Sequence, residues 1–276
     1  MASVVLITGC SSGIGNALCW AFQSKGYRVV ATARQAAQLQ ELQAAGMAVM
    51  ELDVNNQQTV EKVIHSILAT EGKIDVLVNN AGFGQFGPLI DINQAKLRQQ
   101  FQTNTFAPLA LVQQVAPSMK AQSSGLIVNI GSISGLVSTP FAGAYCASKA
   151  ALHSLSEVMR MELAPFNIQV VTVHPGAIAS SFGNSAESSL DEVVRPESWY
   201  AKLETNIQAR AKLSQLAATP PDEFAAELVA QVTKPNPPSV IRLGKKSIWL
   251  PWLKRILPNR LMEFMLTRKF GLTDLS

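Results

Sequence analysis

Short apolar runs alternate with amphipathic stretches along the first two thirds of the chain. The runs have the length and composition of strands buried in a parallel sheet, and we expect strands at 4–7, 28–32, 48–52, 74–78, 126–130 and 168–173. Between them, apolar residues recur with helical spacing, which predicts helices near 17–22, 36–45, 59–69, 93–120 and 144–164. Strands that alternate with helices predict an α/β fold: a single doubly wound, Rossmann-type domain with a parallel sheet and helices on both faces.

A glycine-rich turn follows the first predicted strand and precedes the first predicted helix. It reads Thr-Gly-Cys-Ser-Ser-Gly-Ile-Gly, with glycines at Gly9, Gly13 and Gly15. Glycines in this context permit a tight turn and a close approach of a pyrophosphate to the backbone, with the free N–H groups of the helix start facing the phosphates. The competing interpretation, an ordinary surface turn, is weakened by the flanking strand and helix.

Polar residues follow other predicted strands in the same way. Asp53 follows the third strand, Asn79-Asn80-Ala81-Gly82 follows the fourth, Ser132 the fifth and Pro175-Gly176 the sixth. Ligands of doubly wound sheets bind at the carboxyl ends of the strands. We therefore expect these residues to meet the glycine turn at one edge of the sheet.

Composition and charge narrow the class of protein further. Hydrophobic residues make up 47% and charged residues 15% of the 276 residues, which is typical of a globular chain with a large core. No apolar run reaches the ~18 residues of a membrane span, and the N-terminus lacks the pattern of a secretory signal. The three cysteines match no metal or redox spacing, and the net charge of +4 argues against a nucleic-acid partner. We expect a cytoplasmic protein without a metal site.

Taken together, the motifs resemble those of the short-chain dehydrogenases/reductases. The resemblance covers roughly residues 3–180 and rests on the glycine turn, Asn79-Asn80-Ala81-Gly82, Ser132 thirteen residues before Tyr145, the Tyr-x-x-x-Lys pair Tyr145 and Lys149, and Pro175-Gly176, with Asn104 where the family has a structural asparagine. The last third resembles a looser subgroup that includes 17β-hydroxysteroid, retinol and acyl-dihydroxyacetone-phosphate reductases.

The resemblance implies acid–base roles for four residues. Tyr145 and Lys149 are four apart, so they share a helix face. Tyr145 would donate a proton to a carbonyl oxygen as hydride arrives from a nicotinamide, and Ser132 would hydrogen-bond the same oxygen. Lys149 would lower the tyrosine pKa, together with the charged nicotinamide, and hold the ribose, while Asn104 would hold a water that links Lys149 to solvent. The alternative is a packed tyrosine beside a solvated lysine.

The end of the second strand indicates the choice of cofactor. Members that bind NAD place an acidic residue there, whereas this chain has Ala33 followed by Arg34. Arg34, with Ser11, can grip a 2′-phosphate, so we predict NADP(H) in preference to NAD(H); a solvated Arg34 is the alternative. Asp53 with the backbone of Val54 resembles the family's adenine contact, or is a plain turn aspartate. The other expected cofactor contacts are Gly9, Ser12, Gly13, Ile14, Gly15, Asn80, Ala81, Gly82, Tyr145, Lys149, Pro175, Gly176 and Ile178.

Apolar side chains beside these motifs predict the character of the substrate. An apolar cavity is expected from Phe83, Phe86, Leu136, Val137, Phe141 and Phe182. Such a cavity favours a small lipophilic carbonyl or alcohol substrate. Trp199 and Tyr200 either line the cavity or pack in the core. His153 and His174 are expected to pack rather than to react.

The C-terminal segment carries the charge of the chain. Residues 240–276 hold eight basic side chains against two acidic ones, so the segment carries +6 and the preceding chain −2. It is amphipathic and contains tryptophans. It can cap the substrate cavity, form a subunit interface, or make peripheral contact with an anionic membrane surface.

We expect one domain over 1–276: a cofactor-binding and catalytic core at 1–177, a substrate loop and helices at 178–238, and a last strand with the basic segment at 239–276, the later parts forming a small helical lobe. The expected activity is an NADPH-dependent reduction of a ketone or aldehyde, as in an alcohol dehydrogenase or carbonyl reductase. The rival from another class is a non-catalytic NADP(H)-binding sensor; an epimerase or dehydratase of nucleotide sugars is disfavoured by the apolar cavity. The family's habit of pairing through the helices near 95–120 and 145–165 implies a homodimer or homotetramer.

Overall fold

The computed structural model describes residues 2–179, 196–213 and 218–275. Within them, seven parallel strands form one sheet in the order β3-β2-β1-β4-β5-β6-β7. The strands are β1 (Val4–Ile7), β2 (Arg28–Ala33), β3 (Ala48–Glu51), β4 (Val76–Asn79), β5 (Gly125–Ile130), β6 (Ile168–Pro175) and β7 (Val240–Leu243). The predicted doubly wound parallel sheet is therefore confirmed.

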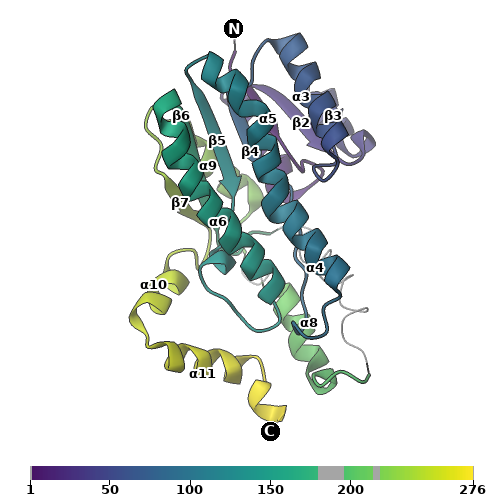
Figure 1. The fold of residues 1–276 in the computed structure, drawn as a ribbon, viewed down its shortest axis with the longest axis vertical. Helices are drawn as coiled ribbons and strands as arrows, with labels where there is room; N and C mark the ends of the chain where they lie inside the picture. Colours follow the sequence, from purple (N-terminus) through teal and green to yellow (C-terminus); the bar gives the residue numbers. More distant parts are fainter. Residues whose placement is uncertain (1, 180–195, 214–217, 276) are drawn as a thin grey trace.

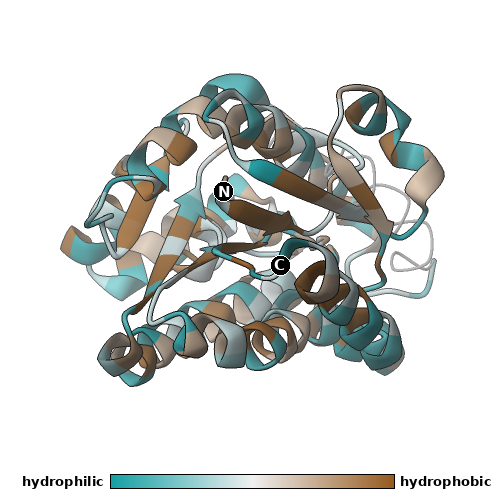
Figure 2. Ribbon diagram, turned by 90° about the horizontal axis from the view of Figure 1, so that it is seen from above, coloured by the Kyte–Doolittle hydropathy of each residue, from teal (hydrophilic) through white to brown (hydrophobic). Residues whose placement is uncertain are grey.

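Helices cover both faces of this sheet, as Figures 1 and 2 show. One face packs on α1 (Gly13–Ser24), α2 (Gln40–Ala44) and α9 (Pro221–Val232), whose apolar residues join one core cluster. The other face packs on α3 (Gln57–Glu71), α5 (Ala107–Ala121) and α6 (Gly143–Leu163), which form the second cluster. Because both faces are covered, the strands are apolar along almost their whole length.

The helix expected over 93–120 is interrupted. The structure has α4 (Gln94–Phe101), then a π-helical segment (Gln102–Phe106), then α5. The wider π turn places Thr103, Asn104 and Thr105 in buried positions. Helical spacing of apolar residues could not reveal this, because the side chains that the segment buries are polar. Similarly, the helix expected at 36–45 begins as a 3₁₀ turn (Ala36–Leu39) before α2.

The strand order reverses between β1 and β4, which lie side by side although about 70 residues separate them. The first connection from β1 goes to β2 on one side, and the chain later returns to β4 on the other. At such a switch point the loops after the two strands separate and leave a crevice. The glycine turn follows β1, so the fold places it at this crevice.

The later part of the chain forms a helical lobe beyond the carboxyl ends of the strands (Figure 1). It contains α8 (Glu204–Lys212), α10 (Trp249–Ile256) and α11 (Asn259–Lys269). Its core joins the two halves of the chain through Phe86, Phe141, Ala142, Cys146, Leu203, Ile207, Ala211 and Phe270. Trp199 is exposed, and Tyr200 packs edge-on against Phe141. Among the described helices, none is both long and apolar enough to cross a membrane.

Candidate active site

The glycine turn is pressed against the loop that follows β4. Gly9 and Gly13 have φ values of +71° and +58°, in the left-handed region that favours glycine. A Cβ on Gly9 would lie 2.8 Å from the Cα of Ala81. The Asn80 side chain donates to the carbonyl oxygens of Thr8 and Gly9 at 2.9 and 3.0 Å. The turn is thus held in place with its backbone uncovered by side chains.

A cavity of about 940 Å³ extends from this turn to the C-terminal helices. At the end near the turn it is lined by every cofactor contact expected from the sequence, namely Gly9, Ser11, Ser12, Gly13, Ile14, Gly15, Arg34, Asp53, Val54, Asn80, Ala81, Gly82, Tyr145, Lys149, Pro175, Gly176 and Ile178. The carboxyl edge of the sheet therefore brings together residues from across the first 178 positions.

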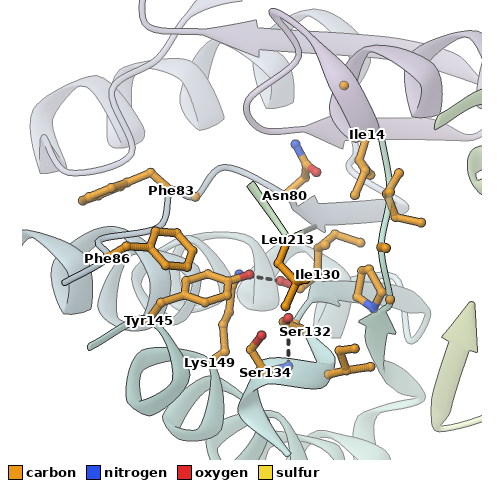
Figure 3. Close-up of a pocket in the computed structure, with 18 of the residues that line it drawn as sticks. Ile14, Asn80, Phe83, Phe86, Ile130, Ser132, Ser134, Tyr145, Lys149 and Leu213 are labelled. Atoms are coloured by element: carbon orange, nitrogen blue, oxygen red, sulfur yellow. Dashed lines mark hydrogen bonds between the residues drawn. The ribbon is translucent and has the colours of Figure 1, made fainter. Parts of the chain in front are cut away.

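Tyr145, Lys149 and Ser132 lie around one point of the cavity (Figure 3). Tyr145 and Lys149 come from α6, and Ser132 comes directly after β5. All three side chains are buried. The Lys149 ammonium donates to the carbonyl oxygen of Ile130 at 2.8 Å, and Ser132 Oγ accepts from the Ser134 N–H at 3.0 Å. Each side chain is therefore fixed by the backbone at the end of β5, by the turn that follows it, or by burial.

Burial shifts the proton affinities of this cluster in opposite directions. It raises the pKa of Tyr145 to about 12, although a hydrogen bond with Ser132 and the charge of Arg210 act the other way. It lowers the pKa of Lys149 to about 8. Both shifts follow from the same cause, because burial disfavours the charged form of either group. In the protein alone, Tyr145 is thus a neutral phenol at neutral pH, able to give a proton.

Asn104 lies behind this cluster rather than on the cavity surface. Its side chain accepts from the N–H of Phe83 at 3.2 Å, and donates to the Phe83 carbonyl at 2.9 Å and to Ser148 Oγ at 3.2 Å. A Cβ on Gly82 would lie 3.1 Å from Asn104 Oδ1 and 3.6 Å from Lys149 Nζ. Asn104 therefore ties the loop after β4 to α6, close to Lys149.

His153 and His174 form a stacked pair beneath Ser132. Their ring centroids are 4.1 Å apart, and His153 Nε2 accepts from the Ser132 N–H at 3.3 Å. A Cβ at Gly131 or Gly135 would collide with the His153 ring, so those glycines make room for it. Burial lowers the pKa of His153 to about 3 and that of His174 to about 4. The sequence predicted packing for both, but not that His153 would hold the backbone at Ser132.

The far end of the cavity is mainly apolar. Phe83, Phe86 and Val137 line it as expected, together with Leu213, Trp249, Leu250, Leu253, Met262, Met265, Leu266 and Phe270. Two expected residues are absent from the lining: Phe141 packs in the lobe core, and Leu136 presents its carbonyl to Lys254 at 2.7 Å. Phe182 lies outside the described residues.

Sequence reasoning missed several polar residues that line the cavity. Gln38 lies in the 3₁₀ turn that follows Arg34, close enough along the chain for Arg34 to have indicated it. Asn55 and Thr103 also line it and are hydrogen-bonded to each other at 3.0 Å. Arg210, Lys246 and Lys269 come from the lobe, and no motif pointed to them. Their positions depend on how the lobe packs, which local pattern does not encode.

Comparison with known proteins agrees with this geometry. The model of the short chain dehydrogenase family matches residues 3–191. Short-chain dehydrogenase ptmH of Penicillium ochrochloron is 34% identical over 272 residues, which cover 98% of each chain. A solved short-chain dehydrogenase from Streptomyces avermitilis has a TM-score of 0.80 at 29% identity, covering 99% of this chain and 97% of that one. A metagenomic short-chain oxidoreductase in complex with NADP has a TM-score of 0.61 at 33% identity, covering 71% and 93%. With this fold, these motifs and these relatives, the chain belongs to the short-chain dehydrogenase/reductase family of oxidoreductases.

Proposed function

We propose that the protein is an NADP(H)-dependent oxidoreductase that interconverts a lipophilic ketone or aldehyde and its alcohol. One observation carries the proposal: the buried side chains of Tyr145, Lys149 and Ser132 lie around one point of a cavity that also contains the glycine turn. A reacting group at that point is within the same enclosed space as a nucleotide on the turn. Proximity of this kind is a large part of enzymatic rate enhancement.

The residues at the turn fit a dinucleotide. The positive φ values at Gly9 and Gly13 leave the backbone bare, and α1 begins at Gly13 with its free N–H groups at the cavity. Asp53 and Val54 line the cavity after β3, where an adenine would lie, and Lys149 lines it where a ribose would lie. When bound, a reduced nicotinamide supplies a hydride for the carbonyl carbon.

The proton comes from the protein. Tyr145 donates its phenolic proton to the carbonyl oxygen, which completes the alcohol, and takes it back in the oxidation. Ser132 donates a hydrogen bond to the same oxygen and so stabilises the charge that develops there. Lys149, held by the Ile130 carbonyl, keeps a positive charge beside the tyrosine that favours the phenolate left behind. Asn104 links the loop after β4 to α6, the helix that carries Lys149.

Preference for NADP(H) is proposed from the end of β2. The small Ala33 is followed by Arg34, an exposed residue that lines the cavity together with Ser11 and Gln38. A guanidinium and two neutral polar side chains suit a 2′-phosphate, and no carboxylate stands at Ala33 or Arg34 to repel one. The metagenomic relative is described in complex with NADP, which supports the same choice.

The exposed apolar residues and the buried cysteines support proposals about the oligomeric state and the cellular location of the protein. The expected pairing helices leave Phe106, Val158 and Met161 exposed at 52%, 43% and 63%, which favours a homodimer or homotetramer formed through α4–α5 and α6. The three cysteines are buried and reduced, as suits a cytoplasmic protein. The amphipathic α10 offers a peripheral membrane contact.

The test is consumption of NADPH in the presence of a carbonyl panel: steroid ketones, retinal-like and long-chain aldehydes, acyl-ketone phosphates and small ketones. We expect turnover with at least one class and a loss of about 100-fold or more in Tyr145→Phe, the range that general acid–base catalysis supplies. Tyr200→Phe, a tyrosine in the lobe core, is the matched control and should keep its activity. Turnover that survives Tyr145→Phe would contradict the assigned role. Tight NADPH binding with no turnover across the panel would favour the sensor.

A further inference from the structure

Arg210 is a buried guanidinium in the substrate end of the cavity. It lies on α8, is 7% exposed and lines the same cavity as Tyr145. Its Nε donates to Thr139 Oγ1 at 2.9 Å, and its guanidinium carbon lies 5.2 Å from the centroid of the Phe86 ring. Its charge is close enough to Tyr145 to lower the pKa of that phenol.

No carboxylate of the described residues pairs with this charge. The ion pairs of the described residues are Arg28–Glu71 and Lys73–Asp75, near the amino ends of β2 and β4. Arg210 donates instead to the neutral hydroxyl of Thr139. A guanidinium has five N–H donors, and burying its charge without an anion is costly. One hydroxyl and one aromatic face compensate for only part of that cost. The cavity is the place from which an anion can supply the rest.

We propose that Arg210 binds an anionic group of the substrate, a carboxylate or a phosphate, while Tyr145 donates its proton to the carbonyl oxygen of the same molecule. This inference rests on the proposed function and names its substrate class. Phe86 sets the distance between the two groups: its ring centroid lies 6.1 Å from that of Tyr145 and 5.2 Å from the Arg210 guanidinium. Both groups therefore lie against the same ring, so one substrate molecule can contact both.

The apolar end of the cavity indicates the chemical character of the rest of the substrate. Beyond Arg210 the walls come from apolar side chains of α10 and α11, among them Leu250, Leu253, Met262 and Leu266. These side chains suit an alkyl chain, because each methylene that they remove from water strengthens binding. The substrate is thus amphiphilic: an oxo acid, or the phosphate ester of a hydroxyketone, that carries an alkyl chain.

The first experiment compares charged and neutral versions of one carbonyl compound. NADPH consumption is measured with oxodecanoates that carry the ketone at successive positions, with their methyl esters, and with a hydroxyketone of equal length and its phosphate ester. We expect kcat/KM to favour an anion over its neutral partner by about 10- to 150-fold, the value of a charge-assisted contact. The carboxylate and phosphate arms show which anion is preferred.

Variants assign that preference to Arg210. Arg210→Met should bring the ratio of anion to neutral compound close to one, and Arg210→Lys should keep part of it. Because both compounds are measured on the same variant, a general loss of activity cancels in the ratio. Lys212→Met, which removes an exposed charge from the same helix, is the matched control and should leave the ratio unchanged. Wild-type protein that reduces neutral ketones as well as their anions would overturn the inference and leave the proposed function standing.

A binding measurement covers the case in which no carbonyl is reduced. Calorimetry of the NADP-saturated protein with decanoate, decyl phosphate and decanol reads the anion site without turnover. Stronger binding of either anion, lost in Arg210→Met, would support the site even if the proposed reaction is wrong. Equal binding of decanol and both anions would overturn it.

Discussion

Lys149 is the residue whose charge matters most for the pH dependence of the proposed reaction. Burial lowers its pKa to about 8, so its ammonium is intact at neutral pH and is lost as the pH rises through about 8. Tyr145, with its pKa raised to about 12, stays protonated over the same range. We predict that kcat/KM for NADPH falls above pH 8, because this parameter reports the ionisations of the free enzyme.

The measurement is a pH–rate profile of wild type and Lys149→Met. The variant should lose about 100-fold or more at pH 7 and should show no decline near pH 8. A wild-type profile that stays flat from pH 7 to 9.5 would show that the ammonium is not needed. Lys245, exposed on the loop after β7, provides the control as Lys245→Met, whose profile should match that of wild type.

Arg34 carries the second prediction at this scale. Arg34→Ala should reduce kcat/KM for NADPH by about 10- to 150-fold and leave kcat/KM for NADH nearly unchanged, since the loss of one charge-assisted contact affects only the phosphate. Steady-state kinetics with the two cofactors give both numbers. Arg98, an exposed arginine of α4 that does not line the cavity, is the control. An equal loss of kcat/KM with both cofactors would mean that Arg34 does not bind the 2′-phosphate.

At the scale of single elements, the π-helical segment concentrates buried polar contacts. Asn104→Ala removes three hydrogen bonds and leaves the N–H of Phe83 without that partner, whereas the Phe83 carbonyl keeps its hydrogen bond from Gln100 at 2.7 Å. Unsatisfied buried groups cost about 1–3 kcal/mol each, so we expect the free energy of unfolding to fall by about that amount or somewhat more. Urea denaturation measures the change. Gln94→Ala, on the exposed first turn of α4, should stay within about 0.5 kcal/mol of wild type.

The elements themselves were largely predictable, and the reason is local. Strands such as β4 and β5 are short apolar runs, and their burial on both faces makes them recognisable without any knowledge of partners. The π segment was not predictable, because the residues that it buries, Thr103, Asn104 and Thr105, are polar and give no apolar periodicity to detect. β6 extends to Pro175, beyond the expected end, since a proline can occupy the strand end while Gly176 continues the pairing with Leu243.

The residues of the candidate site also fall into two groups, those that sequence motifs indicate and those that only the folded lobe brings to the cavity. Many residues near the glycine turn belong to motifs whose spacing follows from the strand ends, so the sequence pointed to them, but it did not point to Gln38, Asn55 or Thr103. Arg210, Leu253 and Phe270 belong to no motif, and they reach the cavity only because the lobe folds across the strand ends. Phe141 was assigned to the cavity because it is apolar and near Tyr145, but its backbone turn, with φ of +62°, directs it into the lobe core.

At the scale of the whole molecule, α10 gives the protein a basic and aromatic surface. Trp249 and Trp252 stack at 5.4 Å and are 58% and 52% exposed, close to Lys254 and Arg255. We predict that the protein binds vesicles containing anionic phospholipid and is released by salt, because charge and exposed tryptophans act together at such surfaces. Co-sedimentation measures it.

A variant separates this surface from the cavity. Trp252→Ser should weaken vesicle binding several-fold while the enzyme keeps its turnover, since Trp252 does not line the cavity. Trp20→Ser, a half-exposed tryptophan on α1, is the control that should bind as wild type does. If the protein does not sediment with anionic vesicles at low salt, α10 contributes only to the wall of the cavity.

The position in the sequence of the residues that form the apolar wall of the cavity has a consequence for the evolution of the protein. Within the described residues the last strand of the sheet ends at Leu243, and most of the apolar wall comes afterwards, from α10, α11 and Phe270, as one continuous stretch. A sequence that exchanges only the stretch after Leu243 therefore keeps the nucleotide half and the reacting tyrosine while acquiring a different cavity wall. In such a lineage, new substrates can arise by recombination at a single junction, and the sequences before and after that junction can record different histories.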